Sequence, residues 1–426
     1  MSRARPASIS LSGMASRRGP VRRLPTPGRL TADIETWLTA EYATTLRSIT
    51  RHVRPTGDER LLVDFHPAAA PVAIVVSDAG RVDVTMEAVY AGPGYHRFVG
   101  RVLERLGQEF SIEWPAPSED PSAAASFSDR ATTERDYLGW LGPALADVQA
   151  ARRLGSGLQH LGTPSGVTYS IGGALATVLG PRDDAWLDAA IADPRLAIDI
   201  VPWWADAPDG RSLMNQALVL MWLEIRWRRP ALEGEGELFD EVHRLLSRAY
   251  PIDPDLPYPW TAWAEVATLR GIDDPMARQA IARAERDGEP PGAPIGYRRL
   301  PVRICHEGWV LQGVPGSFAE RRIDGEWWGG GAGRGITLAA VDTGTMSSEA
   351  FLDQVATGLG PDVLDHRAGP VVGRGRLTSD ASSGVAVGVV EGFSAVSGSG
   401  AVIRIVFDDP ADWQWALETW RGLAPG

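Results

Sequence analysis

Residues 60–88, RLLVDFHPAAAPVAIVVSDAGRVDVTMEA, carry the clearest sheet pattern in this chain and indicate its fold class. The apolar runs Arg60–His66 and Val72–Ser77 and the alternating stretch Arg81–Ala88 each predict a β-strand. Asp78-Ala79-Gly80 lies between the last two runs and is typical of the turn in a β-hairpin. The stretch therefore predicts three strands, of which the last two pair as a hairpin.

Helical patterns flank these strands on both sides. Apolar residues recur at helical spacing over Thr31–Ile49, and again from Tyr95 to Leu106 after the chain-breaking Gly92-Pro93-Gly94. A short strand is predicted at Ile112–Trp114, and a polar loop follows it. The order α-β-β-β-α-β predicts a small N-terminal α+β domain over residues 31–131.

Residues 1–30 have a different composition from the rest of the chain. They contain seven arginines and no acidic residue, and they show no apolar periodicity. This composition predicts a disordered basic arm. The arm could bind an acidic partner or nucleic acid, or it could reflect translation that truly starts at Met14, so its partner stays undetermined.

The middle of the chain, residues 132–290, is predicted to be mainly helical. A hairpin of Val167–Ile171 with Ala176–Leu179 is the predicted exception, and residues 289–292, EPPG, read as a linker. The last four predicted helices look like two antiparallel pairs. The helices are expected at Glu134–Arg153, Asp184–Ile191, Ser212–Arg229, Leu238–Tyr250, Trp260–Leu269 and Pro275–Arg286.

Residues 296–426 become strand-rich again. A helix is predicted at Ser348–Leu359 between the strands, and another at Ala411–Leu423 near the end of the sequence. The predicted strands are Tyr297–Ile304, Gly308–Gln312, Gly335–Val341, Pro370–Leu377, Gly384–Glu391 and Ala401–Phe407.

This element order, together with AVIRIVFDDPADWQWALETWRGL at residues 401–423, resembles the PsbP-like α/β sandwich fold. The resemblance covers about the last third of the chain. It implies an antiparallel-sheet α/β sandwich and, because members of that fold act mostly as binding or assembly modules, it implies interaction rather than catalysis. As a whole the chain resembles a bacterial family, but this resemblance does not point to any particular activity.

Composition excludes several classes of enzyme. The chain has 42 basic residues and all are arginine, so it lacks the lysine that a Walker A loop, a protein kinase or a Schiff-base enzyme needs. Its one cysteine, Cys305, cannot form an internal disulfide, a Cys-rich zinc site or an iron–sulfur cluster. The seven histidines show no i, i+4 pairing. We therefore predict no cofactor and no metal.

Charge and hydropathy also restrict the partners. The net charge is −12 although the first thirty residues carry only basic charges, so the folded body is strongly acidic and is predicted not to bind nucleic acid. No apolar run reaches the length of a membrane span, so no membrane partner is expected. A single cysteine fits a reducing compartment, and the protein is predicted to be cytoplasmic.

The segment Gly92-Pro93-Gly94-Tyr95-His96 is the sharpest local motif. Glycines between a strand and a helix let a ligand approach the backbone, and free helix N–H groups attract anions. Gly92, Gly94, Tyr95 and His96 are therefore candidate ligand-binding residues. The alternative is a tight turn that feeds a helix, with Tyr95 and His96 packed at the edge of the core.

Tryptophan and arginine residues provide a candidate partner-binding surface. Trp327 and Trp328 precede a glycine run that ends at Gly335, which we predict to be a flexible hairpin with one tryptophan exposed. Arg334 lies in that run, and Trp227 and Arg228 follow an expected helix core. The sequence favours a non-catalytic cytoplasmic adaptor that binds another protein through these residues. The alternative is an enzyme with a site centred on His96 and Tyr95.

Overall fold

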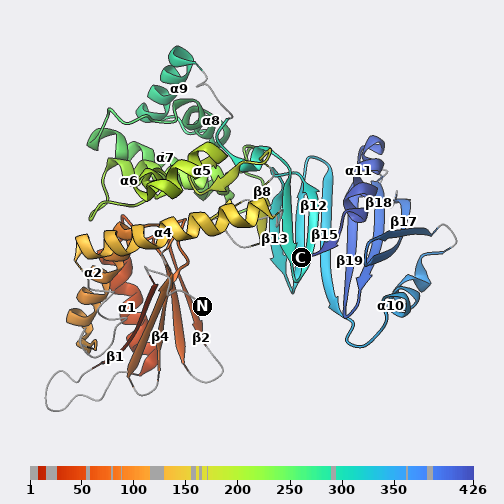
Figure 1. The fold of residues 1–426 in the computed structure, drawn as a ribbon, viewed down its shortest axis with the longest axis horizontal. Coiled ribbons are helices and arrows are strands. Elements are labelled where there is room, and N and C mark those ends of the chain that lie inside the picture. Colours follow the sequence, from red (N-terminus) through yellow and green to blue (C-terminus); the bar gives the residue numbers. More distant parts are fainter. Residues whose placement is uncertain are drawn as a thin grey trace.

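The computed structural model describes residues 8–15, 26–53, 58–77, 80–87, 89–115, 129–154, 160–162, 166–169, 171–288, 294–360, 363–380 and 387–426. The chain is a multi-domain α+β protein, as the sequence predicts. Figure 1 shows an N-terminal sheet with its helices, a helical middle part and a C-terminal part built mainly of strands. Most of the predicted loop over 115–131 and the linker over 289–292 lie outside the described residues.

The N-terminal unit is a six-stranded sheet of order β2-β3-β4-β5-β1-β6 with helices packed against it. Alternation places Leu61 and Val63 in the core at 0% exposure, and Phe65 meets Phe98 at the helical layer with ring centroids 5.3 Å apart. The elements are β1 (Ser8–Ala15), α1 (Pro27–Glu41), β2 (Ser48–Val53), β3 (Glu59–Asp64), β4 (Val72–Val76), β5 (Arg81–Glu87), α2 (Pro93–Phe110) and β6 (Ile112–Glu113).

The prediction of a disordered arm over residues 1–30 is wrong for the part that the structure describes. Ser8–Ala15 forms strand β1, which pairs with β5 from Ser8 to Met14 and with β6 at its end. Ile9 and Leu11 alternate with serine and are almost fully buried. That period of two was hidden between arginine-rich flanks at residues 1–7 and 16–25, which lie outside the described residues.

The first predicted helix is also corrected. Helix α1 begins at Pro27 and ends at Glu41, whereas the apolar spacing predicted Thr31–Ile49. Ile49 instead lies in β2 opposite Val63 of β3. Leu46 and Ile49 continue the helical spacing of the apolar residues although they lie beyond the end of α1. Periodicity alone therefore did not show where the helix ends and the strand begins.

The middle part contains two packed helix pairs, α6 with α7 and α8 with α9. Aspartates cap the predicted helix starts: Asp183, Asp209 and Asp274 each accept a backbone N–H from three residues ahead. The elements are α4 (Arg130–Arg153), β7 (His160–Leu161), β8 (Val167–Tyr169), β9 (Leu175–Thr177), β10 (Gly180–Arg182), α5 (Asp184–Ala192), η1 (Pro194–Ile200), α6 (Gly210–Leu223), α7 (Glu235–Ile252), α8 (Trp260–Arg270) and α9 (Pro275–Asp287).

Two predictions for the middle part differ from the structure. The strands expected to form one hairpin belong to different sheets, because β8 pairs with β11 while β9 pairs with β10 and β7. Helix α6 ends at Leu223 rather than Arg229, and Trp227 adopts a left-handed backbone with φ of 53°.

The C-terminal part combines a four-stranded sheet of order β20-β12-β11-β8 with a seven-stranded sheet of order β13-β14-β15-β19-β18-β17-β16. Helix α11 packs against β12 of the first sheet and β18 and β19 of the second. The elements are η2 (Tyr297–Arg299), β11 (Val302–His306), β12 (Trp309–Val314), β13 (Ala319–Ile323), β14 (Glu326–Gly331), β15 (Arg334–Asp342), α10 (Ser348–Val355), η3 (Ala356–Gly358), β16 (Leu364–Ala368), β17 (Val371–Asp380), β18 (Val387–Val396), β19 (Ser399–Phe407), η4 (Pro410–Asp412), α11 (Trp413–Arg421) and β20 (Ala424–Pro425).

The boundary expected near residues 290–296 does not separate two independent units. Strand β8 of the middle part completes the four-stranded sheet by pairing with β11. The Tyr297 hydroxyl donates to the Thr177 carbonyl at 2.9 Å and accepts the Thr177 N–H at 3.0 Å. The helical middle and the C-terminal sheets are therefore built as one connected structure.

Candidate functional site

The start of helix α2 holds the residues of the predicted ligand site. Gly92 has φ of 109°, and the Gly94 N–H donates to the Trp203 carbonyl at 3.1 Å. A Cβ atom on Gly92 would come within 2.6 Å of that same carbonyl oxygen. The glycines therefore make room for the neighbouring 201–205 segment, which occupies the place that an anion would take.

Tyr95 and His96 are buried, at 0% and 2% exposure. The ring of Tyr95 lies beside His66, with centroids 5.5 Å apart, and beside Trp203 at 5.7 Å. The Nδ1 atom of His66 accepts the Ala68 N–H at 3.0 Å, so the ring hydrogen lies on Nε2. Neither this Nε2 nor the Tyr95 hydroxyl has a hydrogen-bond partner among the described residues.

Burial keeps the His66 imidazole and the Tyr95 hydroxyl uncharged. Desolvation, with a further effect from the Arg47 guanidinium, lowers the pKa of His66 to about 3. Desolvation and the nearby Asp64 carboxylate raise the pKa of Tyr95. Neither group changes charge near neutral pH, so the pair lacks the tuned proton equilibrium that a general acid or base requires.

Charged groups next to this pair join the N-terminal unit to the middle part. The Arg47 guanidinium forms an ion pair with Asp64 at 2.8 Å and lies 3.8 Å from Glu224, the C-cap residue directly after helix α6. Burial raises the pKa of both carboxyl groups, while Arg47 lowers it. Sequence analysis missed Asp64, His66 and Arg47, because their proximity to Tyr95 arises only when β3, α2 and α6 pack together.

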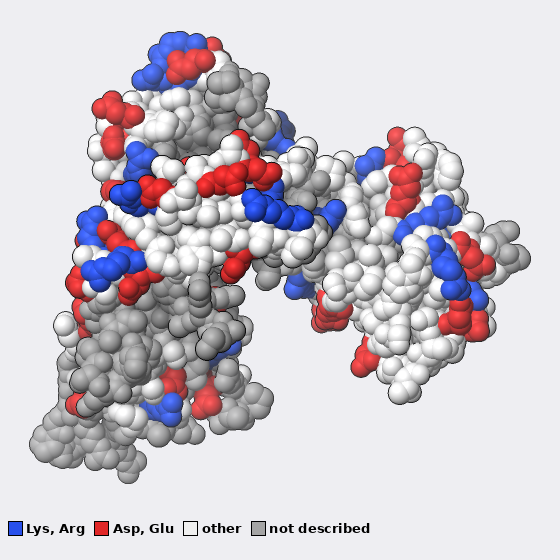
Figure 2. All heavy atoms as spheres, in the orientation of Figure 1, with Lys and Arg blue, Asp and Glu red and all other residues white. Residues whose placement is uncertain are grey.

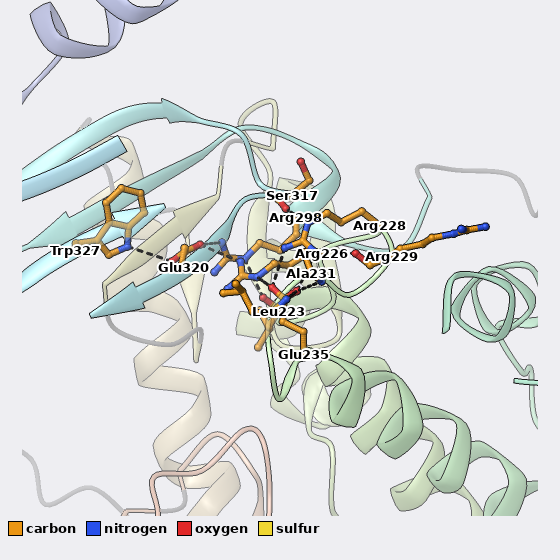
Figure 3. Close-up of polar contacts among 11 residues, drawn as sticks. Leu223, Arg226, Arg228, Arg229, Ala231, Glu235, Arg298, Ser317, Glu320 and Trp327 are labelled. Atoms are coloured by element: carbon orange, nitrogen blue, oxygen red, sulfur yellow. Dashed lines mark hydrogen bonds and ion pairs between the residues drawn. The ribbon is translucent and has the colours of Figure 1, made fainter. Parts of the chain in front are cut away.

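Arg228, one of the predicted partner-binding residues of the middle part, lies in a charged network, shown in Figure 3. Arg228 forms two hydrogen bonds with Glu235, at 2.8 and 2.9 Å, and donates to the Ser317 carbonyl at 2.6 Å. Ser317 belongs to the C-terminal part, so Arg228 acts as an internal link. The Arg228 guanidinium is therefore bonded to groups of this chain, Glu235 and Ser317, rather than presented to a partner.

Glu320 of β13 is the centre of the same network. It accepts from Arg226 at 3.0 Å, pairs with Arg298, and accepts a longer bond from the Trp327 indole at 3.4 Å. Burial opposes ionisation of Glu320, but the guanidiniums of Arg298 and Arg226 together lower its pKa. The carboxylate is therefore charged at neutral pH and ties α6 and its following loop to the C-terminal sheets.

Trp227 is packed rather than free. The guanidinium of Arg299 lies 3.7 Å from the centroid of its ring, and Arg299 is paired with Glu265 of α8. A Cβ atom on Gly296 would come within 2.6 Å of the ring. Trp227 thus fixes the start of the C-terminal part against the helices.

The glycine run after Trp327 and Trp328 is part of a regular strand instead of a flexible loop. Gly329, Gly330 and Gly331 belong to β14. A Cβ atom on Gly329 would come within 2.8 Å of the Trp327 ring, and one on Gly330 within 2.8 Å of the Trp328 ring. Each tryptophan therefore lies over the glycine two residues ahead, on opposite faces of the sheet.

Arg334 is likewise internal. It forms two hydrogen bonds with Asp412, one of them from Nε at 2.6 Å, and its guanidinium lies 4.8 Å from the ring centroid of Trp415. The Asp412 bond raises the pKa of Arg334. These contacts hold the start of α11 against β15.

The pairing of the strands decides which tryptophan faces outward. Trp327 is opposite Leu338, and this row continues through Ile403 to Gly392. A Cβ atom on Gly392 would meet Trp420 of α11, so this row lies on the helix-covered face. Trp327 is accordingly 2% exposed, and Trp328 faces the other side.

On that other side, six residues opposite one another on successive strands form what we term the cross-strand row. Adjacent members are Cα partners in the antiparallel pairing of six neighbouring strands. The row consists of Arg321, Trp328, Thr337, Arg404, Glu391 and Arg376.

The two ends of the row differ in charge balance. Arg376 and Glu391 pair at 2.6 Å, which neutralises that end. Arg321 and Arg404 are exposed and form no hydrogen bond or ion pair with the described residues. The half of the row around Trp328 therefore carries two unpaired positive charges.

Among the described elements, helix α10 is the one that packs on this face, at one end. Its Phe351 lies over Gly400, which pairs with Val341 and Ala395 away from the row. Helices α10 and α11 flank the strands in Figure 1. The indole N–H of Trp328 and the hydroxyl of Thr337 have no partner in the described part of the chain.

Among the described residues, no group of three or more histidine, cysteine or acidic side chains is arranged to hold a metal ion. None of the described helices is both long and apolar enough to cross a bilayer. On the face shown in Figure 2, arginine and acidic side chains are interspersed, with no broad basic patch over the described residues.

Comparison with known proteins adds no assignment. No protein-family model matches this chain, and no curated protein sequence is significantly similar to it. The features that bear on function are therefore the cross-strand row and the network around Glu320.

Proposed function

We propose that this chain is a non-catalytic interaction protein, an adaptor, that binds another protein on the cross-strand row. One observation carries the proposal: Trp328 lies on a sheet face that no described element covers at that point, next to the unpaired Arg321 and near Arg404. Tryptophan and arginine are the residues most enriched where interfaces gain binding energy.

The other predicted interface residues strengthen this assignment by elimination. Trp327, Trp227, Arg228 and Arg334 each have an internal partner. Trp328 is the remaining member of that set, and its place in β14 of a seven-stranded sheet gives it a rigid base. Side chains mounted on sheet strands lose little additional freedom when a partner binds.

The alternative of an enzyme centred on Tyr95 and His96 has less support. Both residues are buried, and the helix N-terminus beside them is occupied by the Trp203 carbonyl. An adaptor also agrees with the PsbP-like resemblance of the last third. The single cysteine supports a cytoplasmic setting.

The test is affinity capture with the tagged full chain and with two tryptophan variants. Trp328→Ala removes the ring from the row, and Trp413→Ala is the matched control because Trp413 is 49% exposed on α11, the helix of the opposite face. We expect a partner that the parent chain and Trp413→Ala retain and Trp328→Ala loses. A partner retained equally by all three chains would move the interface away from the row.

A further inference from the structure

The spacing and charge of the row indicate what kind of segment it fits. We propose that the row binds an extended acidic segment of the partner, with carboxylates at positions i and i+4 and an aromatic or proline ring at i+2. This inference rests on the proposed function and specifies its partner. It follows from the positions of Arg321, Trp328, Thr337 and Arg404.

The distance between the unpaired arginines sets the spacing of the carboxylates. Arg321 lies on β13 and Arg404 on β19, which are three strand positions apart in the sheet. At about 4.8 Å per strand, their Cα atoms are separated by about 14 Å. An extended chain advances about 3.3 Å per residue, so residues i and i+4 are about 13 Å apart.

Extended geometry also places the intervening side chain correctly. Residues i, i+2 and i+4 of an extended chain point to the same side. The i+2 side chain then falls about 7 Å from each carboxylate position, between Trp328 and Thr337. In a helix, residues i and i+4 are separated by only about 6 Å along the axis, so one helical turn does not span the two arginines.

The Trp328 ring is suited to receive a flat group. The benzene edge of the Trp328 ring, at Cζ2 and Cη2, lies over Gly330, where the missing side chain makes room for it. An aromatic or proline ring of the segment can pack against the Trp328 ring in an offset-stacked or edge-to-face arrangement. The unpartnered indole N–H and Thr337 hydroxyl can bond to the backbone of the segment.

Charge favours a short acidic protein segment over a nucleic acid strand. Arg321 and Arg404 can neutralise two carboxylates, while Glu391 is already paired with Arg376. A nucleic acid carries a charge at every phosphate, and the acidic body of a chain whose total net charge is −12 repels such a strand. A segment with two acidic residues experiences less of this repulsion.

The test uses fluorescence anisotropy with the full chain and synthetic peptides. The first peptide carries Glu at i, Tyr at i+2 and Glu at i+4 in a Ser/Thr background. A second has Gln in place of both glutamates, and a third moves the second Glu to i+3, where it points to the other side. An oligothymidylate serves as the nucleic acid probe.

We expect the first peptide to bind more tightly than the second and third, and its affinity to fall as salt is added. Arg321→Gln and Arg404→Gln should each weaken it by about 2- to 5-fold. Trp328→Ala should weaken it by about 10-fold or more. Arg303→Gln is a matched control, because Arg303 is an exposed, unpaired arginine on β11 of the other sheet.

Several results would overturn the inference. These are equal binding of the first and third peptides, no effect of Arg321→Gln and Arg404→Gln, no binding of the first peptide, or tighter binding of the oligothymidylate through the same arginines. If capture of a partner is lost with Trp328→Ala but not with Arg321→Gln or Arg404→Gln, the proposed acidic segment is wrong. The proposed adaptor function would still stand. Loss of the Trp328 dependence itself would reject both.

Discussion

At the residue scale, two adjacent glycines in β14 determine where two adjacent tryptophans can pack. Gly329 and Gly330 differ in which face of β14 they serve, and each leaves room for the tryptophan two positions before it. Trp327 thereby enters the core and donates its indole N–H to Glu320, while Trp328 lies on the opposite face of the sheet, over Gly330. The glycine run that resembles a flexible loop in the sequence is therefore part of a strand, and its missing side chains leave space for two tryptophan rings.

The buried Tyr95 hydroxyl gives a prediction at the same scale. It has no partner among the described residues, so the folded state carries the cost of removing it from water without a compensating hydrogen bond. Tyr95→Phe should leave the free energy of unfolding unchanged or raise it by about 1 kcal/mol, as measured by urea denaturation. A loss of more than about 1 kcal/mol would show that the hydroxyl bonds to a buried water.

Tyr95→Ala serves as the control for that measurement. Removing the whole ring deletes its contacts with His66, Phe98 and Trp203. This variant should lower the free energy of unfolding by about 3–5 kcal/mol. The contrast separates the packing of the ring from the hydrogen bonding of its hydroxyl.

At the element scale, β1 shows how a segment can be structural although its surroundings suggest disorder. Strand β1 pairs with β5 on one side and β6 on the other, so it is an internal strand of the six-stranded sheet. Two apolar side chains, Ile9 and Leu11, supply its core contacts. Strand formation here depends on a partner far along the chain, because an isolated strand of this length has no stability in water.

Leu11→Ala therefore should lower the free energy of unfolding by about 2–4 kcal/mol, because Leu11 is 2% exposed and packed in the core. Chemical denaturation measures the loss. Ser12→Ala is a control on the same strand, since its side chain points away from that core and is exposed. If residues 8–15 belonged to a disordered arm, both substitutions would be neutral and the amides of β1 would exchange with solvent without protection.

At the scale of the whole molecule, the network around Glu320 couples the helical middle to the C-terminal sheets. Arg226 and Arg298 approach Glu320 from two different segments, and Arg226 also lies 3.4 Å from Glu235. The pKa of Glu320 and that of Glu235 are both lowered in the folded state. A carboxyl group with a lowered pKa binds protons less readily when folded than when unfolded.

The junction should therefore weaken in acid. The contribution of these carboxylates is fully present above their ordinary unfolded pKa of about 4.5 and is lost as the pH falls through their lower folded values. Limited proteolysis between pH 7 and about pH 3, the range that brackets these carboxyl pKa values, should show new cleavage between the middle part and the C-terminal sheets at the acidic end.

Glu320→Gln provides the matching variant, because it removes the charge and keeps the shape. It should lower the free energy of unfolding at pH 7 by about 3 kcal/mol, since Arg226 and Arg298 lose a buried partner. The variant should also lose part of the acid dependence. Cleavage with the same pH profile in parent and variant would contradict a role for Glu320 in the junction.

The sequence was sufficient for the elements whose signals are local. The apolar runs and the alternation over residues 60–88 located β3, β4 and β5, and the helical patterns located the starts of α5, α8 and α9. It was insufficient for β13, for the pairing of β8 and for the end of α6. The pairing of β8 depends on β11, more than a hundred residues away, and α6 ends shortly before the left-handed backbone at Trp227. Strand β13 pairs with the neighbouring β14, but its sequence, AERRI, is mostly exposed and lacks an apolar alternation.

By itself, the sequence determined that this is an α+β protein with substantial cores, and its lack of lysine excluded whole classes of enzyme. Only the tertiary structure decided which of two adjacent tryptophans faces outward, and which arginines stay unpaired. The reason is physical: a strand's period of two says that neighbours face opposite sides, but the packing of α11 against one face decides which side becomes core.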